Sequence, residues 1–298
     1  MTIYNQISSN RIRSVLIMIA FVFLFTGFFF LIGKFFNGQG YFIIGLIVSL
    51  LSAVGSYFYS DKIVLWINRA QPADKKTFFD FYTVTENLAI ADGIPMPKIY
   101  VIDDPAPNAF ATGRNPKHAV ICATTGLLNK LERSEVEGVI SHELSHVKNY
   151  DILLSTLVAV LVGTMAYASD WMMRSLWWGG IGGRDDNRDR RNPLMLIGMI
   201  VALVLIPIAA TLIQLAVSRQ REFLADASGA LLTRNPEGLA SALEKISADP
   251  NRMSHANNAT AHLFISNPLK NIRRGSWIAG LFSTHPPIEE RVRLLRSM

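Results

Sequence analysis

Five consecutive positions, from His142 to His146, carry the pattern His-Glu-x-x-His. On an α-helix, residues four apart lie on the same face, so both imidazoles can reach one metal ion. Zinc accepts such nitrogen ligands and, in catalytic sites, keeps one position open for water. Glu143 adjoins the first histidine, where its carboxylate can act as general base toward that water. The pattern predicts metal-assisted hydrolysis, although short motifs also occur by chance on surface helices.

The residues around this motif predict the helix that must carry it. Ser134 and Glu137 have the spacing of a capping box, which indicates a helix start. Val136, Val139 and Ile140 recur at spacings of three and four, as on a helix with one buried face. We therefore expect the two histidines on an amphipathic helix that begins near Ser134.

The hydrophobic residues are gathered into long runs. Half of the 298 residues are hydrophobic and 17% are charged, which is unusual for a soluble domain. The runs cover residues 14–33, 41–60, 152–169 and 193–218. A membrane span needs about 20 apolar residues, so we predict four spans, the first of them a retained anchor and not a signal peptide. Buried helices of a soluble domain are the alternative for the third and fourth runs.

The charge pattern bears on topology and on partners. The net charge is +6, with Lys and Arg dispersed through the polar segments 61–151 and 219–298. No basic stripe with interleaved aromatics stands out, so we expect no nucleic-acid partner. Arg11 and Arg13 precede the first run and predict a cytoplasmic N-terminus and, two spans later, a cytoplasmic catalytic segment. Cys122 is the single cysteine, which excludes an intrachain disulfide and fits a reducing compartment.

One segment conflicts with this topology. The polar connection 174–192 carries five arginines, yet two full spans on either side would place it opposite the catalytic segments. Positive charge is disfavoured on that side. The third and fourth runs therefore form either a transmembrane hairpin or a re-entrant pair, and both would return the chain to the same side.

The predicted fold class is α+β and mostly α. A helix is expected over residues 75–92, ended by Gly93, and short strands over 98–102, 108–112 and 118–124 that form a small sheet. The expected division is a transmembrane hairpin over 1–60, a first catalytic part with the His-Glu-x-x-His helix over 61–151, a second transmembrane or re-entrant hairpin over 152–218, and a second catalytic part over 219–298.

A third metal ligand is expected soon after the fourth run. Glu222 and Asp226 are four residues apart, so their carboxylates share one helical face and repel unless a positive group lies nearby. In one interpretation Glu222 binds the metal and Asp226 holds the free N–H of a ligating histidine. In the other, Arg219 and Arg221 compensate two surface charges. An even number of crossings places these carboxylates and the histidines on the same side of the membrane.

In this order, the motifs resemble the M48 family of membrane zinc metalloproteases, in its bacterial branch. The resemblance is carried by His142-Glu143-x-x-His146, Glu222-x-x-x-Asp226, Pro107-Asn108-Ala109-Phe110-Ala111-Thr112-Gly113 and Thr284-His285-Pro286-Pro287. It implies a gluzincin with a zincin-like catalytic domain, one zinc ion per chain, and His142, His146 and Glu222 as its ligands. It also implies a multi-pass protein of the bacterial inner membrane, with a cytoplasmic site that degrades misfolded or damaged membrane proteins.

The resemblance gives roles to two further stretches. Asn108, Ala109 and Phe110 resemble the edge strand along which an extended peptide substrate lies. The alternative is a loop with a buried Phe110. His285 resembles a histidine that donates to the oxyanion of the tetrahedral intermediate, and the alternative is a histidine in a proline-rich turn.

Three other functions compete with this interpretation. A protease of the same family that trims prenylated peptides is the nearest, but that branch normally has more than four spans. A membrane scaffold with a structural zinc would usually supply four ligands and several cysteines, and the chain has only Cys122. A transporter would carry charges inside its spans, and the apolar runs lack them. The expected partners are therefore polypeptide substrates and the lipid bilayer.

Overall fold

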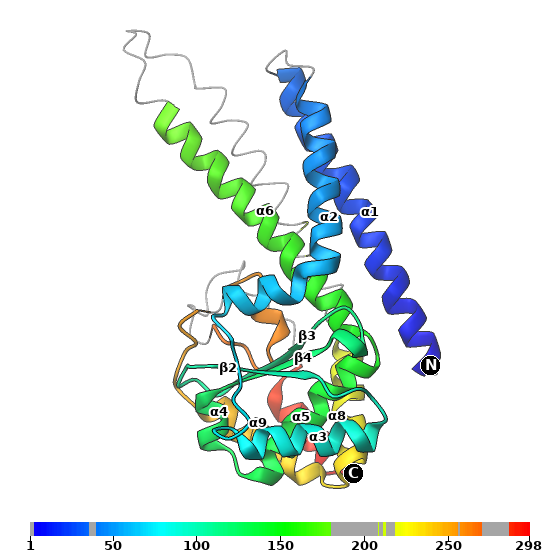
Figure 1. Ribbon diagram of the computed structural model, residues 1–298, viewed down its shortest axis with the longest axis vertical. Helices are drawn as coiled ribbons and strands as arrows, with labels where there is room; N and C mark the ends of the chain where they lie inside the picture. Colours follow the sequence, from blue (N-terminus) through cyan, green and yellow to red (C-terminus); the bar gives the residue numbers. More distant parts are fainter. Residues whose placement is uncertain are drawn as a thin grey trace.

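The computed structural model describes residues 3–35, 40–179, 208, 211–212, 218–255, 257–269 and 286–298. Three long helices extend together from a globular part that contains the sheet and the shorter helices (Figure 1). The long helices are α1 (Ile3–Phe35), α2 (Gly40–Ile67) and α6 (Asp151–Gly179). The shorter helices are α3 (Phe79–Asp92), α4 (Thr125–Lys130), α5 (Arg133–Lys148), α8 (Arg219–Thr233), α9 (Pro236–Ala248) and α11 (Ile288–Leu295), with 3₁₀ turns at Pro116–His118 and Ala261–Leu263.

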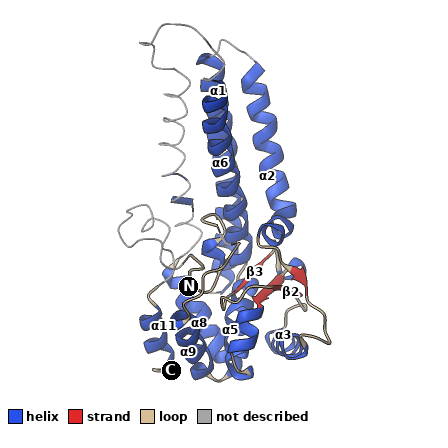
Figure 2. Ribbon diagram, turned by 90° about the vertical axis from the view of Figure 1, so that its left-hand side faces the viewer, coloured by secondary structure: helices blue, strands red, loops and turns tan. Residues whose placement is uncertain are grey.

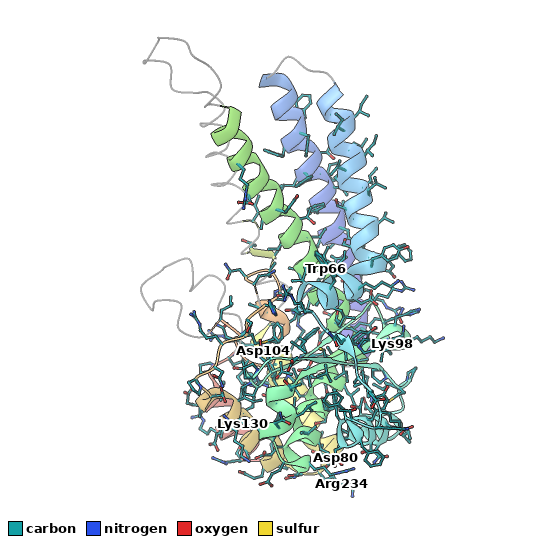
Figure 3. All side chains as sticks on the ribbon, turned by 60° about the vertical axis from the view of Figure 1, so that its left-hand side comes forward. Trp66, Asp80, Lys98, Asp104, Lys130 and Arg234 are labelled. Atoms are coloured by element: carbon teal, nitrogen blue, oxygen red, sulfur yellow. The ribbon has the colours of Figure 1, made fainter. Side chains whose placement is uncertain are left out.

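Helices α1 and α2 form the predicted first hairpin. Ile7–Phe30 and Phe42–Ile67 are long and apolar enough to cross a membrane. Large apolar side chains on both helices face outward, among them Phe23 and Leu51 at 74% and 68% exposure. Such surface is costly in water but not in lipid. Trp66, also exposed, lies where the long helices join the globular part (Figure 3), as amphipathic indole rings do at a membrane surface.

The third long helix continues from the motif helix through a sharp turn. Helix α5 and residues Asp151–Tyr167 of α6 are bent by 85° relative to each other, and they meet the criteria for a span only when taken together. Tyr150, at the turn, has a φ of 60°, in the left-handed region that only a few non-glycine residues adopt. Of the fourth apolar run, the structure describes Ile208, Thr211, Leu212 and Ser218.

The globular part contains a four-stranded sheet in the order β1-β2-β4-β3. Its strands are β1 (Gln71–Pro72), β2 (Lys98–Ile102), β3 (Ala109–Thr112) and β4 (Val120–Thr124). β2 and β4 are parallel, β1 and β3 pair antiparallel to them, and β3 lies at an edge. Helix α5 lies beside β3. Helices α8, α9 and α11 lie on the side of α5 that faces away from the sheet (Figure 2).

One helix and one strand begin later than predicted, because polar side chains hydrogen-bond to the backbone before them. The helix expected from residue 75 begins at Phe79, because the Asp74 carboxylate accepts bonds from Thr77 N and Oγ1 at 2.8 Å and closes a turn. The strand expected from residue 118 begins at Val120, because the Asn115 side chain accepts a bond from His118 N in a 3₁₀ turn. Gly93 ends α3 in the left-handed conformation, as predicted.

The predicted capping box is wrong by two residues. Helix α5 begins at Arg133, with Glu132 as N-cap, and the reciprocal capping bonds join Glu132 and Glu135. Glu135 is buried and also binds Ser241 Oγ at 2.6 Å and Lys245 Nζ at 2.7 Å. Tertiary partners on α9 therefore decide which glutamate caps the helix.

Helices α5 and α8 touch through a glycine. A Cβ added at Gly229 would lie 2.9 Å from Ser141 Oγ and 3.1 Å from His142 N. These distances are tighter than ordinary van der Waals contact, so glycine allows α8 to approach the motif helix. This approach brings Glu222 within reach of the two histidines.

Gly229→Ala is expected to lower the free energy of unfolding by about 1–3 kcal/mol through overpacking. Alanine favours a helix over glycine by roughly 1 kcal/mol, and we expect the cost of overpacking to exceed this gain. Thermal and denaturant unfolding in detergent would measure it. Gly163→Ala is the control, because its added Cβ would meet nothing closer than Ala259 Cβ at 3.8 Å. Equal stability of the two variants would contradict the assignment.

Candidate active site

Three side chains from two helices converge on one point. His142 Nε2 and His146 Nε2 are 3.2 Å apart, and the Glu222 carboxylate oxygens lie 3.8 Å from the first nitrogen and 3.5 Å from the second. Ligands held at about 2.0–2.1 Å around a tetrahedral zinc ion lie roughly 3.3 Å from one another. The two nitrogens and one oxygen of the Glu222 carboxylate all lie within 4.8 Å of one another, close to the spacing of a zinc site and with its donor set.

The histidine tautomers show why a cation belongs there. His142 Nδ1 lies 2.9 Å from Asp226 Oδ1, and His146 Nδ1 lies 3.0 Å from Asp151 Oδ2. An ionised carboxylate only accepts, so each Nδ1 carries the hydrogen. In neutral rings the two Nε2 lone pairs then face each other across 3.2 Å. A proton or a metal ion between the two nitrogens would remove this repulsion, and the two carboxylates would orient the rings toward a bound ion.

Arg291 compensates the carboxylates of α8. Its side chain is fully buried, and Nε and Nη2 donate to the two oxygens of Asp226 at 2.8 and 2.7 Å, while Nη1 lies 3.8 Å from Glu222. Burial raises the pKa of Asp226, but the Arg291 guanidinium and the His142 hydrogen bond outweigh it and hold the pKa at about 2.

Arg219 and Arg221, considered above as surface partners of Glu222 and Asp226, do not pair with Asp226. Arg219 is exposed, and Arg221 lies over Asp151, with Nε 3.6 Å from Oδ1. The positive group nearest to Asp226 thus comes from the far end of the chain, 65 residues later.

Glu143 lines the same small cavity as the three candidate ligands. It is 2% exposed and accepts a hydrogen bond from the backbone of Ala111 on β3. Burial, reinforced by the Glu222 carboxylate, raises the pKa of Glu143 to about 7. A carboxyl with such a pKa can both take and return a proton near neutral pH.

The cavity beside these residues is narrow. Its volume is ≈ 30 Å³, enough for a few water molecules and too small for a peptide. The residues His262, Leu263, Phe264 and Ile265 form one of its walls. We call residues 260–266 the covering segment, because it lines the cavity and bonds to the edge strand β3.

The covering segment also lies on the three residues predicted to contact substrate. Ile265 N donates to Ala109 O at 3.0 Å, and Asn108 Nδ2 donates to Ser266 O at 2.8 Å. Phe110 is fully buried, with its ring centroid 5.0 Å from that of Phe264. The outward carbonyl of the edge strand is therefore occupied by the chain itself in this conformation.

Sequence reasoning missed part of the site. Asp151 received no role, although it ends the motif region five residues after His146. Arg291 and Asn10 received no role either. The sequence signal that could have identified Asn10 and Asp151 is a polar residue just before an apolar run. His285, predicted to stabilise an oxyanion, lies outside the residues that the structure describes.

Comparison with known families decides the class of protein. The sequence profile of peptidase family M48 matches residues 76–298. The chain belongs to peptidase family M48. This match covers both histidines, Glu143 and Glu222, and includes strand β3 and the covering segment.

Full-length relatives of this M48 chain share one name, Protease HtpX homolog. The protein of that name from Caldanaerobacter subterraneus is 44% identical over 306 residues, covering 100% of this chain and 98% of the relative. That from Tropheryma whipplei strain TW08/27 is 45% identical, covering 99% and 98%. Among solved structures, the crystal structure of S. mikatae Ste24p aligns with a TM-score of 0.48 and 19% identity, covering 98% of this chain and 67% of that one.

The protein is thus a membrane metalloprotease. Its family is a peptidase family, its relatives are named proteases, and two helices can cross a bilayer. The His142, His146 and Glu222 atoms, all within 4.8 Å of one another, are a group that can hold a metal ion. This membership favours an enzyme over the structural-zinc scaffold and the transporter.

Arg291→Ala is expected to lower the free energy of unfolding by about 3–5 kcal/mol, because it leaves two buried carboxylates without their cation. Arg293→Ala, an exposed arginine on the same helix, should change it by no more than about 0.5 kcal/mol. Denaturant unfolding of metal-free protein in detergent measures both. Similar losses in the two variants would show that the ion pair does not stabilise the fold.

Proposed function

We propose that this protein is a zinc endopeptidase of the bacterial inner membrane that hydrolyses misfolded or damaged membrane proteins. The observation that carries the proposal is the triangle of His142, His146 and Glu222 at the foot of apolar helices. The bacterial origin of the named protease relatives supports the membrane assignment.

The donor set supports zinc as the metal. Two imidazole nitrogens and one carboxylate oxygen suit a catalytic zinc, which uses three protein ligands. His142, His146 and Glu222 would hold the ion, with Asp226 and Asp151 holding the histidine rings. When bound, zinc supplies a Lewis acid that polarises the scissile carbonyl and makes water more acidic.

Glu143 would move the proton during hydrolysis. Its carboxylate accepts a proton from the attacking water and gives it to the leaving nitrogen, as a general base and then acid. Burial of the Glu143 carboxyl favours the protonated form that the second role requires. Asp226 stays ionised at neutral pH, because its pKa is about 2, and keeps His142 in the tautomer that offers Nε2.

The position of the site supports membrane-protein substrates. Helix α5 carries the histidines and turns by 85° into α6, so the site lies where apolar helices meet the globular part. Peptide segments that leave the bilayer would reach it there. Arg11 and Arg13 before the first span support a cytoplasmic site by the positive-inside rule.

The decisive experiment compares wild type with Glu143→Gln in full-length protein, purified in detergent under chelation and reloaded with zinc. Each variant receives an unfolded membrane protein and, separately, a farnesylated peptide. We expect wild type to cleave the unfolded protein and the variant to lose roughly 10²–10⁴-fold in rate. Both should hold one zinc per chain.

Three outcomes would contradict parts of this proposal. Full activity of Glu143→Gln would remove the proton-transfer role. Cleavage of the farnesylated peptide alone would favour the prenyl-peptide protease. Activity with another metal but not with zinc would overturn the metal assignment.

Asn108→Ala separates two roles of that side chain. If Asn108 holds the covering segment, its loss removes two hydrogen bonds to Ser266, and hydrolysis of limiting substrate should rise roughly 5- to 100-fold. If Asn108 holds the substrate, the rate should fall. Ser266→Ala is the control, because it keeps the backbone groups that Asn108 contacts.

A further inference from the structure

A buried amide lies at the start of the first apolar helix. Asn10, on α1, is 3% exposed and donates through Nδ2 to Asn149 O at 3.0 Å and to Asp151 Oδ1 at 2.7 Å. Its Oδ1 accepts a bond from Arg221 Nη1 at 3.1 Å. These partners are 139 to 211 residues away in the sequence. Side-chain bonds of this kind, between a candidate membrane helix and the globular part, link the two regions directly.

Asp151 passes this contact on to a metal ligand. Its Oδ1 accepts from Asn10, while its Oδ2 accepts from His146 Nδ1 at 3.0 Å. Had α5 continued as a straight helix, residue 151 would lie about 140° around the axis from His146, out of reach. The turn at Tyr150 instead places the Asp151 carboxylate within hydrogen-bond distance of His146 Nδ1.

The pattern of donors and acceptors fixes the orientation of the Asn10 amide. Its NH₂ group faces two acceptors, Asn149 O and Asp151 Oδ1, and its oxygen faces the Arg221 guanidinium. A flipped amide would point its oxygen at both acceptors. An aspartate of the same shape would do so permanently, which makes Asn10→Asp a test of the bonds and not of the volume.

Hydrophobic packing of α1 against α6 fixes the position of Asn10 beside the turn at Tyr150. Ile17, Phe21 and Phe25 of α1 are buried in one cluster with residues of α6, among them Leu154 and Leu157. Near the turn, the Arg11 guanidinium lies 4.3 Å above the Tyr150 ring. The N-terminal end of α1 lies beside the globular part in both ribbon views (Figures 1 and 2). Docking of α1 on α6 therefore holds Asn10 at the turn.

We propose that Asn10 is a positioning residue of the metal site, acting through Asp151 on His146. Helix α1 would then complete the active site in addition to anchoring the chain, although it lies outside residues 76–298 that match the peptidase family. The proposal rests on His146 being a metal ligand and not on the choice of substrate. Without the Asn10 bond, the Asp151 carboxylate and the His146 ring that it orients are held less firmly, which weakens metal binding.

The test measures the zinc dissociation constant of full-length protein in detergent by competition with a chelator. Asn10→Ala and Asn10→Asp are expected to weaken zinc binding roughly 10–100-fold. Ser14→Ala is the matched control, since Ser14 is buried on the same helix one turn later and bonds to Asn10 O, not to Asp151. It should bind zinc within about twofold of wild type. At saturating zinc, the Asn10 variants should lower kcat and leave KM unchanged, because the peptide does not contact Asn10.

A double-mutant cycle separates positioning from general destabilisation. In an Asp151→Ala background, adding Asn10→Ala should not weaken zinc binding further, because the path to His146 is already broken. Additive losses would overturn the proposal, and so would unchanged zinc binding in both Asn10 variants. If Asp151→Ala does not fold, Asp151→Asn replaces it. Failure of wild type itself to bind zinc would instead refute the proposed metal site.

Discussion

Buried carboxylates around two histidines are the constraint on which this structure depends. Glu222, Asp226 and Asp151 are each at most 5% exposed, beside imidazoles that turn lone pairs toward one point. Removing such charges from water is costly unless cations and hydrogen bonds compensate them. Arg291 and Arg221 supply positive charge, and a metal ion held by His142, His146 and Glu222 would add to it. The helices must therefore converge closely enough for all of these groups to meet.

The fold meets this requirement with elements far apart in the chain. Gly229 lets α8 approach α5, the turn at Tyr150 returns Asp151 to the motif helix, and α11 inserts Arg291 from the other side. Helix α1 reaches the same network through Asn10. A candidate membrane helix and the peptidase domain are thus joined through Asp151 to His146, one of the three candidate metal ligands.

The same closeness explains why the site is narrow. The covering segment lines the cavity beside the candidate metal ligands, bonds to Ala109 and Asn108, and leaves a volume of ≈ 30 Å³. A peptide that pairs with this edge must first replace those bonds. Substrate binding at this edge would exchange an internal main-chain contact for a similar contact with the peptide, and the free-energy difference between the two contacts would be small.

The sequence by itself determined the local features, and only tertiary structure decided their partners. Helical periodicity places His142 and His146 on one face, and apolar runs predict α1 and α2, because both patterns depend on neighbours in the chain. Strands β2, β3 and β4 and the helix end at Gly93 were predictable for the same reason, but β1, two residues that pair with β2, was not predicted. The capping glutamate was not, because α9 selects Glu135. Asp151, Arg291 and Asn10 act through a turn, a distant helix and a membrane anchor, and no local spacing encodes contacts across 65 to 141 residues.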